Sequence, residues 1–188
     1  MSEAPLLRLG GVACLRGGRL LFEGLELALA PGEAMLVTGP NGVGKSSLIR
    51  IAAGLLRPSA GSVERGATAL ADEALALDPK QTVAAALGFW AKLDGADAAP
   101  GLEAMGLTRL ASVPVRMLST GQRKRAVLAR VIASGAKLWL LDEPANGLDS
   151  EGRDRLTQAI ARHRAAGGAV LAASHQPLIL GAHRELAL

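Results

Sequence analysis

A glycine-rich segment near the start of the chain restricts the possible folds more than any other feature. The sequence GPNGVGKSS, residues 39–47, begins at the last glycine of the apolar run AMLVTG and opens the helical pattern KSSLIRIAAGLL. It matches the pattern G-x-x-x-x-G-K-[ST] in a strand, loop and helix context, where glycines let backbone amides approach a polyphosphate. The alternative is an ordinary glycine-rich turn with an exposed lysine. We predict a phosphate-binding loop within an α/β core.

The predicted loop supplies the groups that a nucleotide and its metal ion require. Lys45 is expected to bridge the β and γ phosphates of ATP, and the Ser46 hydroxyl is expected to ligate Mg²⁺. The helix that follows begins with a cation and no acid, as expected where a helix start faces phosphate. The candidate nucleotide-binding residues of this segment are Gly39, Pro40, Asn41, Gly42, Val43, Gly44, Lys45, Ser46 and Ser47.

Two acidic residues directly follow a second apolar run. Asp142 and Glu143 come after LWLL, residues 138–141, and parallel sheets bind their ligands beyond the carboxyl ends of the strands. We expect Asp142 to reach Mg²⁺, directly or through water, and Glu143 to hold the attacking water. Pro144 should keep Glu143 out of the helical region, with its carboxylate at the strand end. The alternative is a solvated acidic turn.

A histidine ends a third apolar run. His175 follows the strand pattern GGAVLAAS at the same expected edge of the sheet. We expect it to contact the γ phosphate, and the alternative is a polar strand end without a ligand. His163 and His183 have no comparable placement, so we expect both to be solvated.

The alternation of apolar runs with helical patterns predicts one α/β domain whose parallel sheet is covered on both faces. Period-two runs in the first 30 residues instead predict antiparallel strands joined by glycine-rich turns. Residues from about 75 to 117 are rich in alanine and interrupted by glycine and proline. We therefore expect a small lobe of short helices inserted into a core formed by residues of about 1–74 and 118–188.

Composition disfavours several classes of protein. No apolar run approaches the roughly 20 residues of a membrane-spanning helix, and the start MSEAPLLRLGG lacks the pattern of a signal peptide, so we expect a cytoplasmic chain. The net charge of +4 favours polyanionic partners, namely nucleic acid, anionic lipid or nucleotide phosphates. With no Tyr, two Phe and two Trp, the chain is poorly suited to stacking bases, which argues against nucleic acid. Phe89 and Trp90 are expected to fill the lobe's core rather than dock onto another protein, and the single Cys14 to be buried.

Two predicted helices differ in the charge of their first turns. The segment LSTGQRKRAVLAR predicts an amphipathic helix from about Gln122, whose first turn is crowded by the three cations of residues 123–125. Cations there oppose the helix dipole. The segment DSEGRDRLTQAIARHRAAGG instead obeys the capping rules, with Asp149 or Ser150 as N-cap and Gly167 as a stop. The first helix start therefore requires a further explanation.

The segments GPNGVGKSS, LSTGQ, LWLLDEP, NGLD and SHQP, in this order, resemble the nucleotide-binding subunits of ATP-binding cassette (ABC) transporters over essentially the whole chain. The resemblance implies a P-loop NTPase fold, an ABC-type cassette with an N-terminal antiparallel β subdomain and a small inserted helical lobe. It also implies ATP and Mg²⁺ as cofactors, a homodimer on ATP binding and integral membrane transporter subunits as partners. Nucleic acid is not implied.

The resemblance also explains the unusual helix start. In this family the signature sequence contacts the γ phosphate held by the other subunit, so an acid there would be harmful. Asp149 would lie at the same dimer interface. The signature residues of this chain are Leu118, Ser119, Thr120, Gly121 and Gln122.

Longer segments narrow the resemblance within the family. CLRGGRLLFEGL, LSTGQRKRAVLARV and LWLLDEPANGLD are similar to the ATP-binding subunits of the heme exporter of cytochrome c maturation. This similarity implies work at the cytoplasmic face of the bacterial inner membrane, with no direct heme site in the chain. The alternatives are a transporter of another substrate, a nucleotide-gated subunit that does not hydrolyse ATP, and an ATPase acting on ribosomes or DNA.

Two positions depart from the family pattern. Where many members have an aromatic residue that stacks on adenine, residues 14–16 read CLR, and Arg16 is expected to stack through its guanidinium plane. The glutamine that usually links the metal to the lobe also has no match. Asp72 and Glu73 lie nearest to its place, and Gln81 comes too late in the chain.

Overall fold

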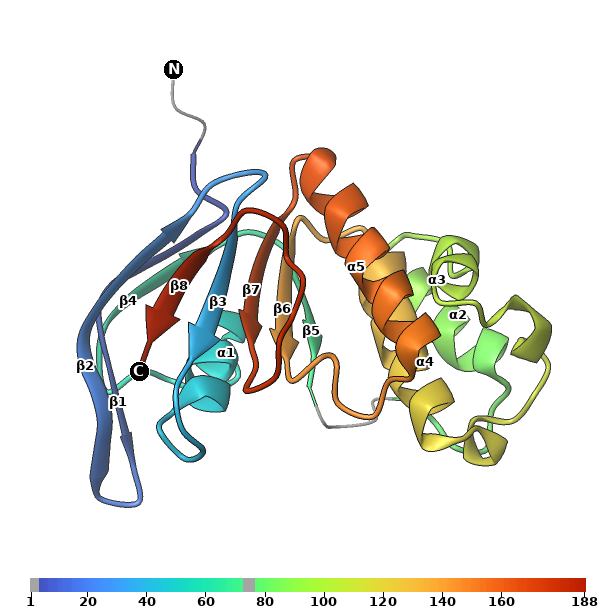
Figure 1. Cartoon of the computed structure of the whole chain (residues 1–188), viewed down its shortest axis with the longest axis horizontal. Helices are drawn as coiled ribbons and strands as arrows, with labels where there is room; N and C mark the ends of the chain where they lie inside the picture. Colours follow the sequence, from blue (N-terminus) through green and yellow to red (C-terminus); the bar gives the residue numbers. More distant parts are fainter. Residues whose placement is uncertain (1–3, 73–76) are drawn as a thin grey trace.

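The computed structural model describes residues 4–72 and 77–188. A curved antiparallel sheet lies at one end, a parallel sheet in the middle and a group of helices at the other end (Figure 1). The arrowheads of the central strands β3, β6 and β7 point to one common edge of the parallel sheet (Figure 1). That edge is where the sequence places the phosphate loop and the acidic residues.

The antiparallel sheet contains one strand that the sequence pattern does not reveal. Strands β1 (Leu7–Arg16) and β2 (Arg19–Leu29) form the expected hairpin. Strand β4 (Ala60–Arg65) joins it from beyond the first helix, giving the order β2-β1-β4. Most of β4 is exposed, so it lacks the alternation of apolar residues by which a strand is recognised.

The parallel sheet has five strands in the order β5-β6-β7-β3-β8. Its pairings between neighbouring strands are parallel, which confirms the expected fold class. Strands β6 and β7 are buried at every position, whereas the edge strand β8 is mostly exposed and is not evident from the sequence. The strands are β3 (Ala34–Thr38), β5 (Thr68–Ala71), β6 (Leu138–Asp142), β7 (Ala169–Ala173) and β8 (Arg184–Ala187).

Alternate residues of β6 enter two different hydrophobic cores. Leu138 and Leu140 pack with helix α1 (Lys45–Ala53) and the antiparallel sheet. Trp139 and Leu141 pack on the other side with helix α5 (Ser150–Ala165) and the helical group. The parallel sheet is therefore covered on both faces, as its apolar strands require.

The C-terminal end of α1 and both ends of α5 follow the capping rules. Helix α1 ends at Gly54, whose φ of 73° places it in the left-handed region that favours glycine. Helix α5 has Asp149 as its N-cap, because the Asp149 carboxylate accepts a hydrogen bond from the Gly152 amide at 2.8 Å. Gly167, just beyond the end of α5, has a φ of 79°.

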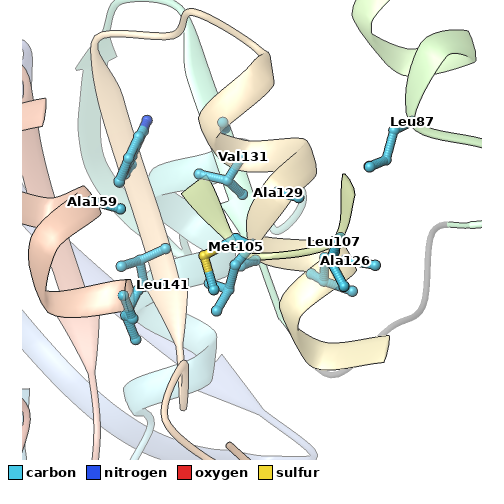
Figure 2. Packing of buried hydrophobic residues seen from close by; sticks show 14 of the residues in the cluster. Leu87, Met105, Leu107, Ala126, Ala129, Val131, Leu141 and Ala159 are labelled. Carbon is cyan, nitrogen blue, oxygen red and sulfur yellow. The ribbon is translucent and has the colours of Figure 1, made fainter. Parts of the chain in front are cut away.

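The helical group includes more of the chain than residues 75–117. Helices α2 (Val83–Leu93) and α3 (Ala99–Ala104) pack against α4 (Thr120–Ala133). Two short 3₁₀ turns, at Thr108–Leu110 and Val115–Met117, connect α3 to α4 along the chain. The packing is tight, because a Cβ at Gly101 would lie 2.1 Å from the Ala129 carbonyl oxygen. Figure 2 shows the buried side chains that join these helices to the sheet. They include Leu87, Met105, Leu107, Ala126, Ala129, Val131, Leu141 and Ala159.

The aromatic pair of this group is only half buried. Trp90 packs against the core, and the Arg130 guanidinium lies 5.0 Å from the centre of its ring. Phe89 meets Trp90 edge to face at 5.5 Å but remains 56% exposed. The expectation that both rings fill the core is therefore correct for Trp90 and wrong for Phe89.

His163 is not solvated, contrary to expectation. Its ring stacks on Trp139 with centroids 3.8 Å apart and planes 8° from parallel, and its Nε2 lies 3.3 Å from the Ala169 carbonyl oxygen. Burial lowers the pKa of His163. A Cβ at the neighbouring Gly168 would lie 2.2 Å from the ring, so only glycine leaves space for it. His183 belongs to an exposed segment, but its ring is engaged there: Nδ1 lies 2.7 Å from the Gly181 carbonyl oxygen and Nε2 lies 3.7 Å from the Glu185 carboxylate.

Cys14 is buried, as expected. Among the described helices, none is both long enough and apolar enough to cross a membrane. Glu73 lies outside the described residues.

Candidate nucleotide-binding site

The loop between β3 and α1 has a shape that requires glycine. Gly39 and Gly44 have φ values of 135° and 123°, which other residues rarely adopt. A Cβ at Gly39 would lie 2.8 Å from the Leu188 carbonyl oxygen, and one at Gly44 would lie 3.1 Å from the Phe22 ring. Helix α1 starts at this loop with no side-chain cap and no acid in its first turn, so its amides remain available to an anion.

Lys45 is buried inside the loop rather than exposed. Only 7% of Lys45 is accessible to solvent, and its Nζ donates hydrogen bonds to the carbonyl oxygens of Gly39 at 2.7 Å and Pro40 at 3.1 Å. An ordinary turn with a solvated lysine is therefore excluded. A buried ammonium group with carbonyl partners is suited to exchange them for phosphate oxygens.

A cavity of about 470 Å³ opens over this loop and extends to the ends of the central strands. Its volume lies in the range of small-molecule sites. The cavity unites the phosphate loop with Glu143 and His175, which the sequence predicted to meet here. Its lining is Leu21, Asn41, Gly42, Gly44, Lys45, Ser46, Ser47, Glu143, Asn146 and His175.

Glu143 is held firmly at the end of the sheet. Its φ of 46° is in the left-handed region, and its amide donates to the Ala173 carbonyl oxygen of β7 at 2.9 Å. His175 Nδ1 lies 2.9 Å from Glu143 Oε1, and the His175 amide donates to the same oxygen at 3.1 Å. Because the Glu143 side chain is only 14% exposed, a solvated acidic turn is excluded. Strained backbone of this kind is typical of functional sites.

Asp142 and Ser46 each offer oxygen atoms that suit a metal ion, and of the two only Ser46 lines the described cavity. Asp142 is the last residue of β6, pairs with Ala173 and is 4% exposed, whereas Ser46 lines the cavity at the start of α1. Mg²⁺ is bound through oxygen atoms, usually from one or two carboxylates together with phosphates. One buried carboxylate and one hydroxyl beside a phosphate loop therefore fit a Mg²⁺ ion that arrives with a nucleotide.

The signature helix begins earlier than the sequence suggested. Helix α4 starts at Thr120 with Ser119 as N-cap, where Ser119 Oγ accepts from the Gln122 amide and Gln122 Oε1 accepts from the Ser119 amide. The cations of residues 123–125 consequently lie beyond the first turn, where the dipole acts less strongly. Arg123 turns back and donates from Nε to the Leu118 carbonyl oxygen at 3.0 Å.

The signature sequence packs against the segment that leads into α5. A Cβ at Gly121 would lie 3.0 Å from the Gly147 carbonyl oxygen, so the two backbones are close. Arg125 of α4 also lies 4.0 Å from the Glu151 carboxylate of α5. None of the described residues 118–122 lines the cavity of its own chain, and Asp149 caps α5 nearby.

Arg16, which was expected to stack on adenine, does not line the described cavity, and neither does Gln81, which comes too late in the chain to match the family glutamine. Arg16 is exposed and faces Arg19 across the tight turn between β1 and β2, while Leu21 of β2 reaches the cavity. Gln81 belongs to a turn, in which its amide donates to the Asp78 carbonyl oxygen. Asn146 also lines the cavity, together with Glu143. It was not among the predicted site residues, although it begins the NGLD segment.

Comparison with known protein families agrees with this geometry. The model of the family described as "ABC transporter" matches residues 22–146, which contain the phosphate loop, the signature sequence and the acidic pair. The chain belongs to the ABC transporter family. It is thus an ABC-type ATPase, and its resemblance to the ATP-binding subunits of ABC transporters is confirmed.

Curated relatives of this ABC ATPase are cytochrome c biogenesis ATP-binding export proteins CcmA. The protein of Sphingopyxis alaskensis is 59% identical, over 97% of this chain and 96% of the relative. That of Novosphingobium aromaticivorans is also 59% identical, over 94% and 92%. That of Rhodospirillum rubrum is 47% identical, over 99% and 87%.

Solved structures share the fold of the ABC ATPase. A putative ABC transporter ATP-binding protein from Pyrococcus furiosus is 21% identical with a TM-score of 0.84, covering 97% of this chain and 96% of that one. A putative metal-chelate type ABC transporter in an inward-facing conformation is 26% identical with a TM-score of 0.80, covering 98% and 80%. These likenesses support the division into an antiparallel sheet and a parallel α/β core.

Proposed function

We propose that this ABC ATPase hydrolyses Mg-ATP to power a membrane transporter of cytochrome c biogenesis, and that the exported cargo is heme. The similarity to cytochrome c biogenesis export proteins over nearly the whole chain supports the place in that process. The contact between Glu143 and His175, in the wall of the cavity above the phosphate loop, is the observation that carries the hydrolytic part. We assign no heme site to this chain, so selection of the cargo belongs to its partners.

ATP is expected to place its phosphates against residues 39–47. Amides of the loop and of the first turn of α1 donate to the phosphate oxygens. Lys45 Nζ, now bonded to two loop carbonyls, turns to the β and γ phosphates. Ser46 and Asp142 would hold Mg²⁺, which would supply positive charge to the phosphates. Arg16, which is exposed at the end of β1, stacks on the base.

Glu143 and His175 then share the hydrolytic step. Glu143 orients a water molecule and accepts its proton while the water oxygen attacks the γ phosphorus. The bond from that phosphorus to the bridging oxygen breaks, so ADP and phosphate leave. His175 holds Glu143 through Nδ1, which leaves its Nε2 to contact the γ phosphate.

Closure of two copies around ATP completes the site. Residues 118–122 do not line the described cavity of their own chain, so a contact with a γ phosphate requires a second copy. The first turn of α4 has no acid and suits such a contact. Asp149 lies at the same interface. Loss of the γ phosphate removes these contacts, and the homodimer separates.

The motor is expected to act at the cytoplasmic face of the bacterial inner membrane, bound to integral membrane transporter subunits. Phosphate release by the assembled transporter tests the hydrolytic proposal. We expect Glu143→Gln to slow release by two or more orders of magnitude, the range of general base catalysis, while ATP affinity is preserved. Turnover at the wild-type rate would refute the role of Glu143, and an inactive wild-type protein would indicate a nucleotide-gated subunit.

A further inference from the structure

Ser174 stands between the end of β7 and His175, and it is buried, with 4% of its surface exposed. Its Oγ lies 3.3 Å from Glu143 Oε2 and 2.9 Å from the Gln176 carbonyl oxygen. We propose that Ser174 is a positioning residue of the hydrolytic site, whose hydroxyl fixes the direction of the Glu143 carboxylate. This inference rests on the proposed role of Glu143 as the residue that orients the attacking water.

Two consecutive residues hold both oxygens of the Glu143 carboxylate. His175 engages Oε1 through its amide at 3.1 Å and through Nδ1 at 2.9 Å. The Ser174 hydroxyl reaches the other oxygen, Oε2, to which the His175 amide is more distant at 3.4 Å. Contacts at both oxygens restrain rotation of the carboxylate, and the Ser174 hydroxyl supplies the shorter of the two contacts at Oε2.

Such a restraint matters because the backbone of Glu143 does not follow a regular strand. Strand β6 ends at Asp142, and the φ of 46° at Glu143 turns the chain out of the sheet. The Glu143 amide is bonded to Ala173, so the main chain is tied to β7. Hydrogen bonds from Ser174 and His175, the two residues that follow β7, then aim the side chain. A misplacement of about 1 Å in a group that orients water costs on the order of 100-fold in rate.

The Ser174 hydroxyl has one proton and two acceptors in reach. Donation to the Gln176 carbonyl oxygen at 2.9 Å closes a local turn, in which Ser174 Oγ also accepts from the Gln176 amide at 3.0 Å. If the hydroxyl donates to Glu143 instead, Ser174 Oγ still accepts from the Gln176 amide, and only the bond to the Gln176 carbonyl oxygen is lost. A purely structural role in the turn is therefore the alternative that an experiment must separate from positioning.

Ser134 provides a matched control for that alternative. Its Oγ donates to the Val131 carbonyl oxygen at 2.7 Å and accepts from the Ala136 amide at 3.2 Å. Like Ser174 it accepts from the amide two residues later and donates to a nearby backbone carbonyl oxygen, here three residues earlier in α4 and away from Glu143. Ser134→Ala removes a local turn of this type without touching a carboxylate.

The test compares Ser174→Ala, Ser174→Thr, Ser134→Ala and Glu143→Gln in the assembled transporter. We expect Ser174→Ala to lower kcat about tenfold while KM and ATP affinity stay within about twofold, because positioning acts on the transition state. Ser134→Ala should keep the wild-type kcat. Ser174→Thr, which retains the hydroxyl, should recover most of the rate.

Three results would overturn the inference. They are an unchanged kcat in Ser174→Ala, an equal loss in Ser134→Ala, and a rise in KM without a fall in kcat. Thermal unfolding of each variant shows whether the added methyl group of threonine disturbs the fold. If it does, Ser174→Ala and Ser134→Ala alone decide the test. Normal hydrolysis by Glu143→Gln would refute the proposed function itself. An inactive Glu143→Gln beside a fully active Ser174→Ala would refute only the role of Ser174.

Discussion

His175 Nδ1 lies 2.9 Å from Glu143 Oε1, and the amide of the same histidine donates to that oxygen at 3.1 Å. The ends of β6 and β7 are adjacent in the sheet, so these two residues meet through the register of the strands. The contact joins the proposed base to the residue that we propose contacts the γ phosphate. Loss of either side chain should therefore affect hydrolysis more than binding.

Replacement of His175 tests this relationship. We expect His175→Ala to lower kcat for ATP on the order of 100-fold, because both the γ phosphate contact and the ring contact to Glu143 are lost. The affinity for ATP should change little, since the loop of residues 39–47 is intact. Steady-state phosphate release and equilibrium nucleotide binding measure the two effects. His183, which does not line the described cavity, supplies a control, and a similar loss in His183→Ala would contradict this account.

Lys45 should contribute mainly to binding. Lys45→Ala removes a buried cation with two hydrogen bonds to the loop, and hydrogen bonds of charged groups contribute about 1.5–3 kcal/mol. We expect the Kd for ATP to rise about 10- to 100-fold. Titration with a fluorescent ATP analogue measures this change. The exposed Lys80 offers a comparison, and an unchanged Kd in Lys45→Ala would argue against the phosphate loop.

Stability should depend on pH through His163. Burial against Trp139, assisted by the charge of Lys137, lowers the pKa of His163 from its reference value of 6.5. The unfolded chain then binds a proton at higher pH than the folded chain. The contribution of the neutral His163 to the free energy of unfolding is therefore complete above pH 6.5 and falls as the pH decreases below that value. Thermal unfolding between pH 7.5 and 5.5 measures the loss. His163→Phe keeps an aromatic ring there and should reduce the dependence, whereas an unchanged slope would exclude His163 as its source.

Packing of the helical group should depend on Gly101. A Cβ there would lie 2.1 Å from the Ala129 carbonyl oxygen, so α3 and α4 must separate in Gly101→Ala. We expect a loss of about 1–3 kcal/mol in the free energy of unfolding. Gly88 in α2 has open space around its added Cβ, and Gly88→Ala should be neutral or stabilising by up to about 1 kcal/mol. Equal effects of the two changes in chemical denaturation would contradict the packing argument.

Most of the candidate nucleotide site could be predicted from the sequence because its parts are short contiguous segments. The loop of residues 39–47 carries its own glycines, lysine and serine, and the chemistry of each is local. Asp142, Glu143 and His175 follow apolar runs directly, so a parallel sheet brings them to one edge. The fold class followed from the same alternation of runs and helices.

Features that depend on distant partners were not readable. The mostly exposed strands β4 and β8 are defined by hydrogen bonds to β1 and β3 rather than by an apolar pattern. His163 is buried because Trp139 and Gly168 leave a slot for its ring, which no spacing along the chain reveals.

The early start of α4 could have been predicted from the sequence. It depends on the capping box of Ser119 and Gln122, a signal that is present in the sequence as S-x-x-Q.

Heme staining of membrane c-type cytochromes tests the central claim most directly, in cells whose only copy of this ATPase carries Glu143→Gln. The account predicts that the heme-stained bands disappear while the variant protein is present at its normal level, because the transporter would bind ATP without turning it over. Normal bands in those cells would contradict the claim that ATP hydrolysis by this subunit drives heme export for cytochrome c biogenesis.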